Sequence, residues 1–223
     1  SHCLALDQEF GEHTLTKLGY LTEAANTVGA QWVQAQPQKD GKNAGEMLTG
    51  AIKAAILLNT EPAFDAAAGA KGLEQADMVI TLSPFKANLD ISDVLLPVAP
   101  FTETSGTFVN AEGRVQSFHA VVKPLGETRP AWKVLRVLAN LLELPGFDYE
   151  SSQDVLTAAI GAETKEVPSA LRSNITKVAA KVPENEAAEP VAASIYQLDG
   201  IVRRATSLQL TADARLAREG GAA

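Results

Sequence analysis

Residues 97–116 bring together side chains that can form strong hydrogen bonds. An arginine guanidinium offers five donors in a planar fork, and a carboxylate can accept two of them at once. The candidates, with the glycines that permit tight turns between them, are Glu103, Asn110, Glu112, Arg114, Gly106 and Gly113. Such a set can line a cofactor site, or it can form a buried network that fixes a turn against a sheet. We expect the structural network, and we predict no catalytic, cofactor-binding or metal-binding residue in this chain.

Two short polar segments follow predicted strands, at the edge of a parallel sheet where ligands usually bind. They are Asn59–Glu61 and Ser83–Phe85. Their amide, hydroxyl and carboxylate groups could bind a small polar ligand, or they could satisfy one another. Neither segment contains a glycine, the residue that most easily brings backbone close to a ligand. The pattern therefore favours mutual hydrogen bonding over a ligand site.

Other reactive residue types are too few or too scattered to form a recognisable site. Gly69–Gly72 follows a predicted helix, so it fits a helix end and turn better than a phosphate-binding loop. His119 has no serine or cysteine partner at a known spacing, and we expect a structural or exposed histidine. Cys3 is the single cysteine, which excludes an internal disulfide, a thiolate zinc site and a multi-thiolate cluster within this chain.

Three apolar runs must position these groups. They cover residues 52–59, 78–82 and 94–98 and end at polar or proline-containing segments. Helical or looped connections separate them, and an alanine-rich crossover helix is predicted over residues 64–75. This order indicates parallel strands in an α/β sheet, and continuous apolarity predicts that both faces of the sheet are covered.

A β-hairpin is predicted where the pattern changes after the third run. Residues 107–110 and 114–118 flank the tetrad Asn110–Gly113. Asparagine at the first position and glycine at the fourth suit a type I turn, with Gly113 free to take a positive φ.

Helical periodicity marks several further segments. The predicted helices cover residues 14–33, 132–142, about 155–160, 171–182 and 195–202, with a surface loop at 36–45 and an acidic linker at 183–190. The sequence thus predicts a mixed α/β fold: a mainly parallel sheet flanked by helices, a β-hairpin and a helical C-terminal tail. We place the α/β domain at residues 1–150 and a helical extension at 151–223. These last helices are too short to fold alone, so we expect them to lie on the domain or on a partner.

The composition is that of a globular chain, with 46% hydrophobic and 21% charged residues among 223. The net charge of -8 argues against nucleic acid or an anionic membrane surface as the main partner, because both would repel it. No stretch approaches the roughly 18 apolar residues of a membrane span. Ser1 is not an initiator methionine and no signal-peptide pattern follows it, so we expect a processed product or a fragment of a longer polypeptide.

The run from Ala76 to Leu142 closely resembles a signature of the molybdopterin oxidoreductase superfamily. The matching segments, in chain order, are Asn59–Pro62, Ala76–Val79, Ser92–Pro97, Glu103–Gln116 and Trp132 at the start of a helix. Within the superfamily, the sequence of residues 97–103 looks most like that of the large iron–sulfur subunit of bacterial NADH–quinone oxidoreductase, respiratory complex I. The segments 203–205 and 208–211 also resemble the C-terminus of that subunit.

The resemblance implies that catalytic relatives place their metal ligand and first cluster upstream and carry a C-terminal β-barrel that caps the cofactor. The residues after 145 fit short helices and are too few for such a barrel. A family fold without its cap fits the complex I subunit, in which the resemblance implies that the molybdopterin site has been lost. We therefore expect a non-catalytic scaffold without a cofactor of its own, and iron–sulfur clusters in the missing N-terminal part of the parent polypeptide.

By the same resemblance, the whole enzyme passes electrons from NADH through FMN and iron–sulfur clusters to quinone and translocates protons. The expected partners are other subunits of the complex I peripheral arm, with no nucleic acid and no direct membrane insertion. The expected location is cytoplasmic, peripheral to the inner membrane. Two alternatives stay open: a fragment of a molybdopterin-dependent enzyme such as formate dehydrogenase, and a small-ligand binding module that keeps the crevice of the sheet.

Overall fold

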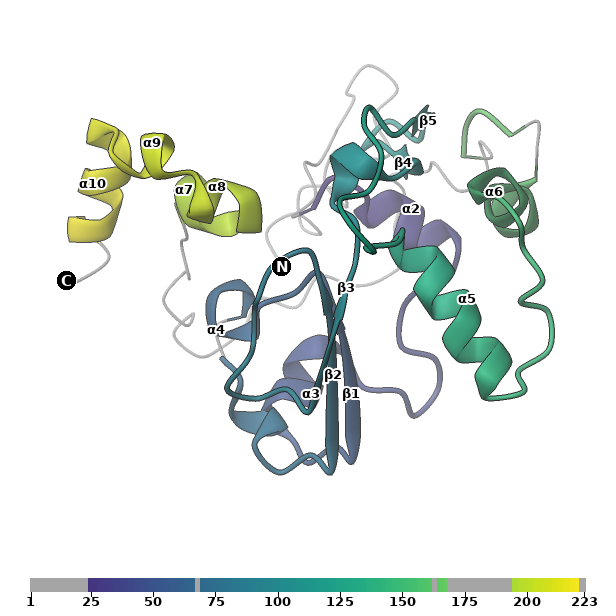
Figure 1. Cartoon of the computed structure of the whole chain (residues 1–223), viewed down its shortest axis with the longest axis horizontal. Coiled ribbons are helices and arrows are strands. Elements are labelled where there is room, and N and C mark those ends of the chain that lie inside the picture. Colours follow the sequence, from purple (N-terminus) through teal and green to yellow (C-terminus); the bar gives the residue numbers. More distant parts are fainter. Residues whose placement is uncertain (1–23, 67–68, 162–163, 168–193, 221–223) are drawn as a thin grey trace, which may run out of the picture. The chain divides into compact units, whose positions relative to one another are not determined.

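The computed structural model describes residues 24–66, 69–161, 164–167 and 194–220 (Figure 1). Contacts divide the chain into two units. One unit combines Ser1–Asp40 with Val98–Ala187, and the other combines Gly41–Pro97 with Ala188–Ala223. The boundary predicted between residues 150 and 151 falls inside the first of these units, so the observed division does not coincide with it. Each unit is described by itself below.

The second unit contains a three-stranded parallel sheet, as the apolar runs predict. Its strands are β1 (Ala54–Leu58), β2 (Met78–Ser83) and β3 (Val94–Pro97), and they lie in the order β1-β2-β3. Both pairings are parallel, with Ile56 opposite Ile80 and Ile80 opposite Val94. The predicted α/β class and the parallel pairing are therefore confirmed.

One face of this sheet is packed against two short helical elements. The core contains Leu48 from α3 (Ala44–Thr49), Leu73 from the 3-10 turn η1 (Lys71–Leu73) and Val79 from β2. Gly72 is required here, because a Cβ atom on it would lie 2.3 Å from the carbonyl oxygen of Leu48. The helix α3 is not among the predicted elements; it begins within the predicted loop 36–45, with a capping box at Asn43.

The opposite face of β1 is open to solvent. Ile56 is 52% exposed and Leu58 is 40% exposed. Exposed and half-buried residues alternate along this strand. The expectation that both faces are covered is thus wrong for β1, because an apolar run shows that a strand can be buried but not what covers it.

The helix predicted over residues 64–75 does not form as one element. The structure has α4 (Pro62–Asp65) and, further on, η1. Ala66 after α4 is extended, with φ -135° and ψ 134°, and Gly69 has φ 62°. Alanine favours helix locally, but the close approach of Gly72 to α3 fixes another path for the backbone.

The first unit contains the predicted hairpin. Strands β4 (Gly106–Val109) and β5 (Val115–Phe118) pair antiparallel. At the turn, the N–H of Gly113 donates to the carbonyl oxygen of Asn110 at 2.9 Å, and Gly113 has φ 84°. Residues 165–167 lie beside β5, where the N–H of Val115 donates to the carbonyl oxygen of Lys165. The hairpin and the positive φ at its glycine are confirmed.

Three helices accompany the hairpin in the first unit. The prediction over residues 132–142 is confirmed by α5 (Ala131–Leu141), and the short helix predicted around residues 155–160 is confirmed by α6 (Ser152–Ile160). Of the helix predicted over residues 14–33, the described part shows α2 (Thr27–Trp32). Residues 14–23, the predicted helix 171–182 and the predicted linker 183–190 lie outside the described residues.

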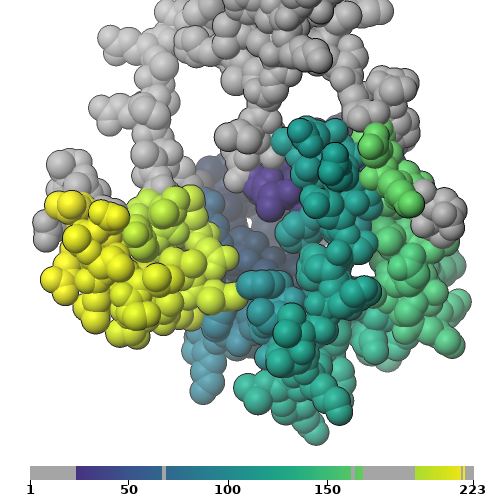
Figure 2. Space-filling model, turned by 90° about the horizontal axis from the view of Figure 1, so that it is seen from above, coloured from purple at the N-terminus to yellow at the C-terminus, as the bar shows by residue number. Residues whose placement is uncertain are grey.

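The C-terminal part of the second unit is helical, as predicted. Its helices are α7 (Ile195–Leu198), α8 (Gly200–Arg204), α9 (Thr206–Gln209) and α10 (Ala212–Gly220). They form one group in Figure 2, coloured from yellow-green to yellow. The single helix predicted over residues 195–202 is broken at Asp199, which is extended and whose carboxylate accepts the N–H groups of Ile201 and Val202.

Candidate functional site: the carboxyl edge of the sheet

Polar groups from both strand ends meet at the carboxyl edge of the sheet. The N–H of Asn59 donates to the carbonyl oxygen of Leu82, and Asn59 itself has φ 51°. The side-chain amide of Asn88 donates to the carbonyl oxygen of Thr60 at 2.8 Å. On the neighbouring strand, the hydroxyl of Ser83 accepts the N–H of Phe85 at 3.1 Å. The groups chosen from the sequence are therefore largely satisfied by the protein itself.

The most buried charge at this edge is the carboxylate of Glu61, which binds two arginines of α8. Glu61 as a whole is only 8% exposed. Arg204 donates two hydrogen bonds, from Nη1 to Oε1 at 2.8 Å and from Nη2 to Oε2 at 3.0 Å. Arg203 Nη2 lies 3.2 Å from Oε1 of Glu61, and Arg203 Nη1 lies 2.8 Å from Oδ1 of Asp65. We call these four residues the arginine clasp.

Two aromatic rings complete the clasp. The guanidinium carbon of Arg204 lies 4.2 Å from the ring centre of Phe85, and that of Arg203 lies 4.9 Å from the ring centre of Phe64. A Cβ atom on Gly200 would lie 3.3 Å from Oε1 of Glu61, so the start of α8 approaches the carboxylate closely. Each guanidinium thus contacts both a carboxylate and an aromatic ring, the two kinds of group that arginine side chains pair with and stack on in proteins.

The electrostatics of the clasp favour its charged form. The hydrogen bond from Arg204 is the largest influence on Glu61, and together with Arg203 it holds the pKa of Glu61 below its usual range although burial opposes this. For Arg203, burial works against the charge, but the contacts with Asp65 and Glu61 outweigh it and raise the pKa. At neutral pH the clasp is therefore a set of paired ions.

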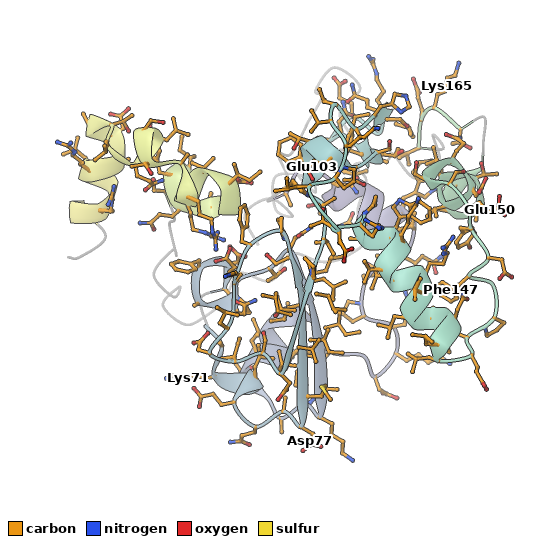
Figure 3. All side chains as sticks on the ribbon, in the orientation of Figure 1. Lys71, Asp77, Glu103, Phe147, Glu150 and Lys165 are labelled. Atoms are coloured by element: carbon orange, nitrogen blue, oxygen red, sulfur yellow. The ribbon has the colours of Figure 1, made fainter. Side chains whose placement is uncertain are left out.

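The residues chosen at 97–116 do not form one network. The side-chain oxygen of Asn110 accepts the N–H groups of Glu112 at 3.1 Å and of Arg114 at 2.9 Å, so these three meet through backbone groups. The side chains of Glu112 and Arg114 are exposed. Glu103 lies on the 3-10 turn η2 (Phe101–Glu103), labelled in Figure 3, and accepts the N–H of Leu125. Because Glu112 and Arg114 are exposed and Glu103 binds the backbone of Leu125, no buried arginine–carboxylate pair forms among these four.

The two turn glycines have separate roles. Gly113 is buried and takes the positive φ described above. Gly106 lies under the ring of Phe118, where a Cβ atom would be 2.5 Å from the ring. His119 is exposed, and Cys3 lies outside the described residues. Within the part of the chain that the structure describes, no group of three or more histidine, cysteine, aspartate or glutamate residues is placed to hold a metal ion.

The sequence points to one half of the clasp and not to the other. Glu61 and Phe85 are strand-end candidates in the sequence, whereas Arg203 and Arg204 stand out there only by resemblance. The available signal was a carboxylate directly after a buried strand, since such a group needs a cationic partner. Nothing local identifies a partner that lies 143 residues away.

None of the helices in the described residues is long and apolar enough to cross a membrane.

Comparison with known proteins gives one family. The profile of the family described as molybdopterin oxidoreductase matches residues 4–141. A Staphylococcus aureus (strain bovine RF122 / ET3-1) protein named as a candidate formate dehydrogenase is 39% identical over 77 residues, which are 34% of this chain and 8% of that protein.

A Bacillus subtilis (strain 168) protein named as the oxidoreductase YjgC is 40% identical over 70 residues, 31% of this chain and 7% of the relative. The matched stretch thus spans less than a tenth of the length of either relative. The family match covers well over half of the chain, and the chain therefore belongs to the molybdopterin oxidoreductase family.

Proposed function

We propose that this chain is a non-catalytic scaffold segment of the large iron–sulfur subunit of an NADH–quinone oxidoreductase. The observation that carries the non-catalytic part is the arginine clasp. In open α/β sheets, ligands bind outside the carboxyl ends of the strands. Here that edge holds a buried carboxylate whose two oxygens are bound by the protein's own arginines.

The residues of this edge do not fit a molybdopterin. The cofactor carries phosphate, but the clasp pairs two arginines with two carboxylates and so offers no net positive charge to an anion. The two arginines that could bind phosphate are paired with Glu61 and Asp65. In addition, neither strand end carries a glycine that would allow close backbone approach. We derive no catalytic step through a pterin held by this segment.

The assignment to the complex I subunit is supported by two resemblances, in residues 97–103 and in the segments 203–205 and 208–211. It is also supported by the helices that fill the described residues 194–220, where a catalytic relative would need the strands of a barrel. In this proposal the iron–sulfur clusters belong to another part of the parent polypeptide. The partners are other subunits of the peripheral arm, on the cytoplasmic side of the inner membrane.

A second candidate is a segment of a formate dehydrogenase-like enzyme. It is favoured by the names of the Staphylococcus aureus relatives, which match at 36–39% identity over 77 residues. In that case, the parent enzyme would hold a pterin, and the segment would support its binding from outside the clasp.

The deciding experiment uses the parent polypeptide that contains this chain, purified in its native assembly. Molybdenum and tungsten are measured by elemental analysis, pterin by fluorescence after oxidation, and activity with NADH plus quinone and with formate. The scaffold proposal expects NADH–quinone activity with far less than one metal and one pterin per polypeptide. Stoichiometric molybdenum or tungsten with formate oxidation would instead establish the second candidate.

A small-ligand module is tested on the chain itself. A ligand at a hundred times its dissociation constant adds about 2.7 kcal/mol to the unfolding free energy. Nucleotides and pterins should leave the thermal unfolding of this chain unchanged. A stabilisation of that size, lost when Glu61 is replaced by glutamine, would show that the carboxyl edge binds ligands and would overturn the scaffold proposal.

A further inference from the structure

The first unit has a cavity of about 410 Å³ beside its hairpin. Five elements contribute to its walls: α2, the two hairpin strands, the start of α5 and α6. Its large apolar side chains include Trp32, Val109, Phe118, Trp132, Leu156 and Ile160. The cavity is thus largely apolar and lies within a single unit, and it is large enough to take a bulky side chain of another molecule.

An ordered apolar loop begins at the wall of this cavity. The N–H of Ala120 donates to the hydroxyl of Ser105, which lines the cavity. Further along the loop, Val121 is 82% exposed and Leu125 is 78% exposed. Backbone hydrogen bonds nevertheless hold the loop in place, since Val121 donates to the carbonyl oxygen of Thr102 and Leu125 to the carboxylate of Glu103.

The exposure of these apolar side chains to water is unfavourable unless another surface covers them. Val122 in the same loop and Phe101 on η2 are also exposed, so four large apolar side chains gather on hydrogen-bonded backbone next to an apolar cavity. A surface that is already rigid loses little conformational entropy when a partner binds. Contiguous exposed apolar residues beside a pocket are typical of interaction sites.

The stretch that contains the loop and the start of α5 is cationic, whereas residues 143–154, which lead into α6, contain four acids and no cation. Residues 114–142 contain five cations and the single acid Glu127, a local charge of +4 in a chain of -8. The Nζ of Lys133 lies 5.3 Å from the ring centre of Trp132, a cavity wall. In the described part of the chain, no carboxylate forms an ion pair with Lys123, Arg129 or Lys133.

Two carboxylates of this unit accept hydrogen bonds from backbone groups. Glu103 accepts the N–H of Leu125, and Asp154 at the start of α6 accepts the N–H groups of Glu150 and Ser151. Lys123 in the loop and Lys133 at the start of α5 have no carboxylate partner in the described residues, so they can pair with carboxylates of another molecule. This charge complementarity selects an acidic partner.

We propose that the cavity and the loop 120–125 form a docking surface for a protein segment that carries an apolar anchor side chain flanked by carboxylates. The anchor enters the cavity, the loop covers its backbone, and Lys123 and Lys133 pair with the flanking acids. An anionic lipid surface fits less well, because the chain as a whole is strongly acidic. The proposal deepens the scaffold role and rests on it only in assigning the partner to a neighbouring subunit.

The test measures binding of dye-labelled peptides to the full chain by fluorescence anisotropy. The first peptide has one tryptophan and one leucine flanked by glutamates. The second replaces both apolar residues by alanine, and the third replaces the glutamates by lysines. The first peptide should bind at least tenfold more tightly than the other two, and its affinity should fall as salt is added.

Matched variants locate the binding. Leu125→Ser and Lys123→Glu should each lower the affinity for the first peptide at least tenfold. The controls are Leu141→Ser, a leucine 77% exposed on α5, and the exposed Lys86→Glu, and both should stay within twofold of the parent chain. Unchanged thermal unfolding of all four variants shows that the differences are not due to folding.

Several outcomes overturn this proposal. They are equal binding of the three peptides, no binding of the first, equal loss with the control variants, or tighter binding to vesicles that contain anionic phospholipid than to the first peptide. These outcomes do not depend on the metal content of the parent enzyme. A failed docking surface would leave the scaffold proposal intact, and a parent enzyme containing molybdenum would leave the docking surface intact.

Discussion

Arg204 and Glu61 form a two-bond ion pair across 143 residues of sequence, with donor–acceptor distances of 2.8 and 3.0 Å. This contact joins the last turn of α8 to the residue that follows β1 by three positions. Because both carboxylate oxygens accept a guanidinium hydrogen, the pair fixes the orientation of the arginine as well as its distance. The docking of the C-terminal helices within their unit therefore depends on a specific geometry and not only on apolar contact.

Replacement of Glu61 by glutamine should strongly destabilise the second unit. The variant leaves Arg203, whose side chain is 10% exposed, and the more exposed Arg204 without their shared carboxylate. The loss of one partner of a buried ion pair costs about 3 kcal/mol. Denaturation in urea, followed by far-ultraviolet circular dichroism, measures the effect. Glu74→Gln, at an exposed carboxylate of the same unit, is the control and should change the unfolding free energy by less than about 0.5 kcal/mol. Equal effects of the two substitutions would contradict the burial of the clasp.

A double-mutant cycle should show direct coupling between the two ends of the clasp. Glu61→Gln, Arg204→Gln and the double variant are compared by the same denaturation method. Residues in direct contact couple by about 0.5–3 kcal/mol, and the bidentate geometry places this pair in the upper half of that range. The pair Glu74 and Arg204 serves as the reference cycle. Additive effects of Glu61 and Arg204 would show that the contact does not form in solution.

The clasp should make stability depend on pH on the acid side. The pKa of Glu61 is lowered from its ordinary value of 4.5 chiefly by Arg204, so the folded state binds a proton there less readily than the unfolded state. Its contribution is therefore full above about pH 4.5 and is lost as the pH falls through the lower folded pKa. The difference in unfolding free energy between the parent chain and Glu61→Gln, measured from pH 6 to pH 3, should shrink below about pH 4.5. A difference that stays constant over this range would rule out the linkage.

In the hairpin, Asn110 should matter more for stability than Arg114. Asn110→Ala removes an acceptor that serves two backbone N–H groups, which costs about 1 kcal/mol. Arg114→Ala removes an exposed side chain and should cost less than about 0.5 kcal/mol. Thermal denaturation of both variants provides the comparison. A loss near 3 kcal/mol for Arg114→Ala would indicate the buried arginine network that the sequence suggested.

Local patterns predicted the elements whose structure depends on local interactions. The strand β2, the turn at Gly113 and the helix α5 lie where periodicity and turn chemistry place them. The helix predicted over residues 64–75 does not form as one element, because the close packing of Gly72 on Leu48 overrides the helix propensity of alanine. The clasp could not be found because its halves are distant in sequence, and arginine and glutamate are both common on solvated surfaces.

The break at Asp199 also restricts how this part of the chain can change. Asp199 caps α8 four residues before Arg203, and both guanidinium groups belong to the last turn of this five-residue helix. Since each residue of an α-helix advances by about 100°, a single insertion or deletion between Asp199 and Arg203 would turn both arginines away from Glu61. Homologous proteins that keep this contact can therefore vary in side-chain identity along α8, but its length should be invariant.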